Sequence, residues 1–307
     1  MIIFIFYFTN TYKVKKNILI ISILFFFLIG ISTSCKKPIY EPKLIFKFEI
    51  DSTQQRLDNF GNPSSIPVGH SAQTPSFNSI SAHYIELAPD MYTAMGTGTI
   101  LYRAEETTLG GANAIDFEKN TKVKDGEEFY SMPIKDVKAG TYQWLRLSLA
   151  YQNYDIVYKY KNPTDTTQNL IGTGTVASFV GFNTYIKSVI VKSQSLAVNA
   201  NKLQGYWAFE TFGFLFSGQA PAGATTVPNP LFASSPIPAG SCVVTAEFAS
   251  SPLTITGNET EDIVVVVKVS NNKSFEWTDV NSDGYYQPDK GDIPTDMGVR
   301  GIQPVVQ

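Results

Sequence analysis

The chain has little cysteine and little histidine for its 307 residues, and these shortages exclude several kinds of site. Cys35 and Cys242 are its two cysteines, too few for a disulfide framework. A zinc site with three protein ligands would need both histidines, His70 and His83, and a carboxylate. Nucleophile elbows, phosphate loops and dinucleotide fingerprints are missing. We therefore expect no enzyme, although a carboxylate pair for glycoside hydrolysis follows no spacing rule and stays open.

The first 36 residues carry the features of a bacterial lipoprotein signal peptide. Lys13, Lys15 and Lys16 precede the apolar run 18–29, and small residues then lead to Cys35. About 12 strongly apolar residues are fewer than the roughly 20 that a membrane-spanning helix needs. We expect a helical signal peptide over 1–34 that is removed, and a lipidated Cys35.

Two further expectations concern the amino-terminal region. Val14 is placed where a signal peptide would begin, so residues 1–13 are interpreted as a wrong start. Residues 36–42 form a tether between the lipid and the folded part. Because stable anchoring takes more than one acyl chain, a multiply acylated Cys35 would hold the protein on the membrane.

Excess positive charge is also missing. The chain has 24 basic and 27 acidic residues, and removal of the leader leaves 21 against 27, a net charge of −6. This balance gives no reason to expect nucleic acid as a partner. Lys36-Lys37-Pro38 has no acidic run, which favours an outer-membrane lipoprotein of the cell envelope that faces the periplasm.

Helical spacing never persists, and alternation of apolar and polar residues dominates. The segments 44–50, 145–151 and 154–160 have the period of two that is typical of strands. Four more segments are rich in β-branched or aromatic residues: 184–192, 206–216, 241–248 and 261–270. About a dozen short strands separated by turn residues predict an antiparallel β-sandwich.

We expect one large β-sandwich domain over 43–307, with long loops at 52–80 and 217–240. The second loop contains five prolines and is the alternative position for a domain boundary. Cys242 stands beside valines at the start of a predicted strand, so a buried small hydrophobic side chain is expected there.

The sharpest motif lies near the carboxyl end and resembles a calcium-binding loop. Asp279, Asn281 and Asp283 match positions 1, 3 and 5, and Gly284 matches the turn at position 6. Lys290 stands where a closing Glu is expected. The candidate ligands are Asp279, Asn281, Asp283, Tyr285, Gln287, Asp289 and Asp292. The alternative is a turn in which Asp279 and Asn281 cap backbone amides and Gly284 has a positive φ.

Aromatic residues beside this loop support a second hypothesis. Trp277, Tyr285 and Tyr286 could stack on a sugar, which predicts a glycan partner. The alternative is that these rings pack in the core or across strands.

The leader, the acidic strand-rich body and the triplets Asp51-Ser52-Thr53 and Asp165-Thr166-Thr167 resemble lipoproteins of Bacteroidota. The segments 44–50, 138–142 and 274–277 are similar to the MbnP-like β-sandwich family. That resemblance implies copper, and a copper site here could draw on His70, His83, Met91, Met95 and a tryptophan. The sequence thus predicts a noncatalytic binding or structural module of the envelope with a glycan or protein partner, and copper handling is the alternative.

Overall fold

The computed structural model describes residues 40–220, 242–299 and 301–307. Glu41–Gln307 form one compact unit. The predicted all-β class is confirmed, because several largely antiparallel sheets pack together in a sandwich-like arrangement. In the described part of the chain no helix is long and apolar enough to cross a bilayer. The signal peptide, Cys35 and residues 36–39 of the tether lie outside the described residues.

The largest sheet is organised around one long strand, β9 (Trp144–Lys161). One edge of β9 pairs with β3, and the other edge pairs with β15 near its start and with β10 near its end. The other members are β3 (Ser76–Ala88), β4 (Thr99–Arg103), β10 (Asn169–Phe179), β13 (Tyr206–Thr211), β14 (Phe214–Gln219) and β15 (Cys242–Glu247). The main order is β14-β13-β10-β9-β3-β4, so β14 is an edge strand.

A four-stranded sheet joins the two ends of the folded unit. It has the order β20-β17-β1-β7 and contains β1 (Lys43–Asp51), β7 (Glu128–Pro133), β17 (Ile263–Ser270) and β20 (Gly301–Val306). β1 follows the predicted alternation, because Leu44, Phe46 and Phe48 are fully buried. The β1–β17 pair is parallel, which departs from the predicted antiparallel pattern.

Three smaller sheets complete the unit. They contain β12-β11-β6-β5, β16-β8 and β19-β18-β2 in these orders. Their strands are β2 (His70–Gln73), β5 (Glu106–Thr107), β6 (Ala114–Asp116), β8 (Gly140–Tyr142), β11 (Asn183–Ile190), β12 (Ser195–Leu203), β16 (Leu253–Ile255), β18 (Phe275–Thr278) and β19 (Ile293–Met297). Short 3-10 helices are η1 (Phe117–Lys119), η2 (Ile134–Asp136) and η3 (Pro288–Lys290).

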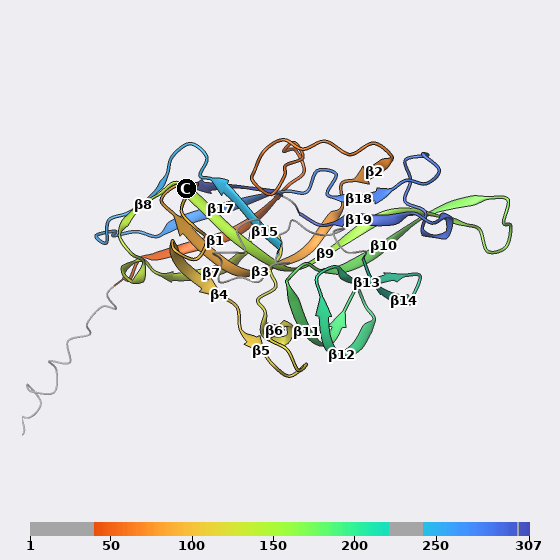
Figure 1. Ribbon diagram of the computed structural model, residues 1–307, viewed down its shortest axis with the longest axis horizontal. Helices are drawn as coiled ribbons and strands as arrows, with labels where there is room; N and C mark the ends of the chain where they lie inside the picture. The colour runs from red at the N-terminus through yellow and green to blue at the C-terminus, as the bar shows by residue number, and fades with distance from the viewer. Residues whose placement is uncertain (1–39, 221–241, 300) are drawn as a thin grey trace, which may run out of the picture. The chain divides into compact units, whose positions relative to one another are not determined.

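The hydrophobic core has several parts. The main cluster combines side chains of the four-stranded sheet with those of β3, β15 and the first half of β9. Beyond it, strands β9, β10 and β13 are covered on both faces, by β11 and its neighbours on one face and by β18 and β19 on the other (Figure 1). This second region contains the candidate site.

Several predicted boundaries are wrong in detail. The segments 145–151 and 154–160 form one strand, β9, and 206–216 is a hairpin. The expected loop 52–80 contains β2 and the start of β3, and the expected loop 217–240 begins inside β14. These stretches are polar or rich in turn residues, but pairing with distant strands overrides local propensity. Cys242 is buried, as predicted.

Candidate functional site

An aromatic cavity lies between the end of the largest sheet and the β18–β19 pair. Its floor is built by alternation in β9, which places Ile156, Tyr158 and Tyr160 on the same face. Gly172 and Gly174 of β10 stand opposite Tyr158 and Ile156 in the register. The floor therefore alternates large side chains with glycines.

The glycines give aromatic rings room to lie on the sheet. A Cβ atom at Gly174 would be 2.2 Å from Cζ of Phe209, and one at Gly172 would be 3.0 Å from the ring of Tyr158. In the same way, a Cβ atom at Gly218 would be 2.6 Å from Cζ2 of Trp207. A side chain at any of these positions would push a ring of the cavity out of place.

One wall is the hairpin of β13 and β14. Trp207, Phe209 and Thr211 share one face of β13, and the register places Phe216 opposite Phe209 and Phe214 opposite Thr211. The facing wall comes from the carboxyl-terminal region. Its side chains are Phe275, Tyr286, Pro288, Pro294 and Met297.

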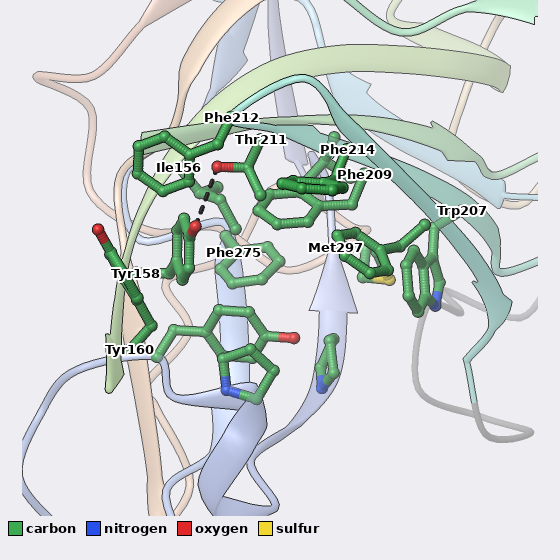
Figure 2. Close-up of a pocket in the computed structure, with 15 residues that line it drawn as sticks. Ile156, Tyr158, Tyr160, Trp207, Phe209, Thr211, Phe212, Phe214, Phe275 and Met297 are labelled. Atoms are coloured by element: carbon green, nitrogen blue, oxygen red, sulfur yellow. Dashed lines mark hydrogen bonds between the residues drawn. The ribbon is translucent and has the colours of Figure 1, made fainter. Parts of the chain in front are cut away.

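The cavity measures about 420 Å³, within the range of roughly 300–1,000 Å³ that is usual for small-molecule sites. Figure 2 shows the rings of Tyr158, Phe209 and Phe275 converging on one space. The hydroxyl groups of Tyr158 and Thr211 are 2.9 Å apart, and Thr211 donates to the carbonyl of Thr173 at 3.2 Å. Burial raises the pKa of Tyr158, so its hydroxyl stays protonated at neutral pH.

The rim of the cavity exposes large apolar side chains. Phe212, Phe214 and Phe216 are 64%, 67% and 52% exposed. Phe212 and Gly213 form the two-residue turn of the hairpin with φ angles of 48° and 76°. A positive φ is unusual for phenylalanine, since this turn type prefers Asn-Gly. The Phe212 ring contacts Tyr160 edge-on, with centroids 5.5 Å apart.

The predicted calcium loop lies next to this cavity, and it brings some of its candidate ligands close to one another. Asp279 accepts from the Ser71 hydroxyl at 2.7 Å and from the amide of Gly284 at 2.8 Å. Burial opposes ionisation of Asp279, but these hydrogen bonds outweigh it and lower its pKa. Gly284 has a φ of 78°.

The other acidic side chains of the loop have partners of different kinds. Asp283 pairs with Lys159 and accepts from Gln287, while Asp292 accepts from the amides of Val280 and Gln287. The remaining candidates, Asn281, Tyr285 and Asp289, are exposed. Within the described ranges, no three His, Cys, Asp or Glu side chains gather where they could hold a metal ion. Asp279 caps the amides of Asp283 and Gly284, as in the turn alternative, whereas Asn281 caps no amide in the described ranges, and calcium binding stays a prediction.

The two histidines contact different carboxylates. His70 binds Glu276, which also pairs with Arg56, whereas the buried His83 lies 3.0 Å from Glu106. The hydrogen bond from His83 is the main cause that lowers the pKa of Glu106 to about 2. The structure therefore does not show a shared pair of histidine ligands, and copper binding stays a prediction.

The three residues of the sugar-stacking hypothesis differ in how deeply they are buried. Trp277 is 1% exposed and packs against Phe275 and Tyr286, so it cannot stack on a sugar. Tyr286 lines the cavity, and Tyr285 lies on the surface beneath Lys159. Sequence reasoning missed the cavity because its walls come from separate segments; the alternating aromatic residues of 154–160 and 207–216 were the available indication.

Comparison with family models, with curated proteins and with solved structures gives no match for this chain. The protein is therefore described by its structure, as an all-β protein with an aromatic cavity at one end of its largest sheet.

Proposed function

We propose that this protein is a noncatalytic binding module of the cell envelope, tethered to the membrane through lipidated Cys35, which holds a small apolar ligand in the aromatic cavity. The observation that carries the proposal is the cavity itself. Nine of its fifteen lining side chains are aromatic, and the remaining six are aliphatic, proline, methionine or threonine. Such a lining excludes water from a bound apolar surface.

The lining favours an apolar ligand over a glycan. The lining has four hydroxyl groups. Those of Tyr158 and Thr211 bond to each other, and Thr211 also donates to the backbone, which leaves only those of Tyr160 and Tyr286 for a ligand. A buried sugar would bring many hydroxyl groups that each need a partner, and burying a polar group without one is costly. We therefore place glycan binding behind apolar-ligand binding.

The rim supports a role in binding rather than in stability. Phe212 occupies a backbone conformation that costs on the order of 1–3 kcal/mol, yet its ring is mostly exposed. An asparagine would fit the turn without that cost. Together with Phe214 and Phe216, it forms an apolar patch that is continuous with the cavity. Exposed patches of this kind are typical of ligand-binding grooves.

The direction of β1 supports access to the ligand away from the tether. Seven residues lie between Cys35 and Lys43, which makes eight residue-to-residue steps, so the tether spans at most about 29 Å. β1 then runs from Lys43 to Asp51, which pairs with Ser270, shortly before β18 in the chain. The cavity is thus at the far end of β1, and the envelope compartment can reach it.

Fluorescence titration of the purified mature protein with N-phenyl-1-naphthylamine tests the binding function. We expect saturable binding, and at least about tenfold weaker binding after Phe214→Glu and Phe216→Glu together, because each change places a charge in an apolar rim. Ile171→Glu is the matched control, since Ile171 is exposed on the opposite face of β10. No saturable binding, or equal weakening by the control, would refute the proposal.

The tether is tested separately. Cells that express the full chain are labelled with a palmitate analogue, and Cys35→Ser serves as the control. We expect the parent protein to carry the label and the Cys35→Ser variant to lack it. An unlabelled parent protein would remove the lipid anchor from the proposal.

A further inference from the structure

The geometry points to an uncharged, planar aromatic molecule as the ligand of the cavity, with one hydrogen-bond acceptor for the hydroxyl group of Tyr286. This inference rests on the proposed function and names the ligand class for that same site. It depends on the shape of the lining, on one hydroxyl group without a partner and on the charge beside that group.

The shape follows from the rings and the glycines beneath them. Phe209 lies over Gly174 and Trp207 lies over Gly218, so both rings rest close against the sheet. Phe275 and Tyr286 form the facing wall, with an edge-to-face arrangement at 5.1 Å. Aromatic rings prefer offset or edge-on contacts with other rings. A flat ring system can make such contacts with both walls at once, whereas an acyl chain cannot.

The hydrogen-bonding group follows from the tyrosines of the cavity. Tyr158 is bonded to Thr211, so its hydroxyl group is already used. Tyr160 also lines the cavity, but Figure 2 shows its hydroxyl group directed away from the space between the rings. Tyr286 lines the cavity, and its hydroxyl group forms no hydrogen bond with any side chain or backbone group in the described ranges. Burial, with a contribution from Asp292, raises the pKa of Tyr286, so the hydroxyl group remains a donor. A ligand acceptor would satisfy it.

The absence of charge on the ligand follows from Asp292. This carboxylate is buried, and in the described ranges it accepts hydrogen bonds from the backbone amides of Val280 and Gln287 rather than pairing with a cation. Its negative charge acts on Tyr286, and an anionic group bound at the same hydroxyl would be repelled. Fatty acids and other carboxylates are therefore disfavoured.

The test uses two matched pairs of compounds that displace N-phenyl-1-naphthylamine from the mature protein. The first pair is 9-fluorenone and fluorene, which share a planar skeleton and differ in the carbonyl acceptor. The second pair is palmitate and hexadecan-1-ol, which share an acyl chain and differ in charge. We expect fluorenone to bind best, and about tenfold tighter than fluorene, the effect of one added hydrogen bond.

Tyr286→Phe removes only the hydroxyl group and should make fluorenone and fluorene bind equally, with fluorene affinity unchanged. Better displacement by palmitate or hexadecan-1-ol would overturn the inference and leave the proposed function standing. If Tyr286→Phe prefers fluorenone over fluorene as strongly as the parent protein does, Tyr286 does not bind the acceptor of the ligand. No displacement by any compound, with no binding of the naphthylamine itself, would instead refute the proposed function.

Discussion

Glu210 offers the most direct test of how the cavity wall is held in place. It is buried on the face of β13 opposite Phe209 and Thr211. Its carboxylate accepts from the backbone amides of Lys192, Ser193 and Gln194 at 2.7–2.9 Å. One side chain thus satisfies three backbone donors of the turn between β11 and β12 and joins that turn to β13.

The expected loss on Glu210→Gln can be worked from these bonds. All three amides donate to the same carboxylate oxygen, so the glutamine oxygen can keep these bonds, and the Ser193 hydroxyl can turn to accept from the new amide group. The loss is that of the charge, because a hydrogen bond to a charged group contributes about 1.5–3 kcal/mol and a neutral one about 1 kcal/mol. We expect the free energy of unfolding to fall by about 2–3 kcal/mol at pH 7, measured by urea denaturation.

The loss of unfolding free energy caused by Glu210→Gln should become smaller as the pH falls. Burial opposes ionisation of Glu210, but the hydrogen bonds from the Ser193 hydroxyl and the three amides lower its pKa from 4.5 to about 2. The contribution of the carboxylate is therefore fully present above pH 4.5 and is lost as the pH falls toward 2. The difference between parent and variant should narrow over this window.

Glu247→Gln is the matched control because Glu247 is exposed on β15, and its stability should follow the parent at every pH. A difference between parent and Glu210→Gln that stays constant from pH 7 to pH 3 would refute the reasoning. A difference below about 0.5 kcal/mol at pH 7 would do the same, since surface substitutions have effects of that size.

Two further predictions concern the cavity and the acidic loop. Gly174→Ala should lower the free energy of unfolding by about 1–3 kcal/mol and weaken naphthylamine binding, because the new methyl group meets the Phe209 ring. Unchanged binding would contradict the ring placement. Gly140→Ala is the control, because Gly140 is also a strand glycine without a positive φ and its Cβ would make only an ordinary contact, 3.6 Å from the Tyr142 ring. For the loop, calcium is expected to raise the melting temperature relative to chelator, and Asp279→Ala should abolish that difference; a parent protein indifferent to calcium would end the calcium hypothesis.

Features of the fold that depend on residues close together in the sequence could be predicted. The alternation of Leu44, Phe46 and Phe48 predicted both the strand and its buried face, because burial of one sheet face requires a period of two. The turn at Gly284 was also predictable, since its positive φ is a local property. Contacts between distant segments could not be predicted from the spacing of residues within each segment. The partners of Glu210 lie 16 to 18 positions away and depend on how β11 and β13 pack.

In the cavity, too, the strands could be predicted from the sequence but the contacts between them could not. Tyr158 and Phe209 each belong to a recognisable alternating run, but nothing in either run indicates that the two rings meet. The glycines of Gly-Thr-Gly-Thr at 172–175 leave room for aromatic rings on the sheet, and only the strand register reveals which rings lie there.

The parallel pairing of β1 with β17 has a consequence for the order in which the protein can be made. The backbone amide of Lys43 bonds to the Asp262 carboxylate, 219 positions later in the chain. A nascent chain that emerges amino end first can pair one edge of β1 with β7, but the other edge stays open until β17 has been made. Contacts so distant slow folding, because the entropy of closing the loop is lost before the pair forms. Completion of this sheet is therefore expected to be a late step of folding, in which β17 closes the open edge of β1 and β20 then pairs with β17.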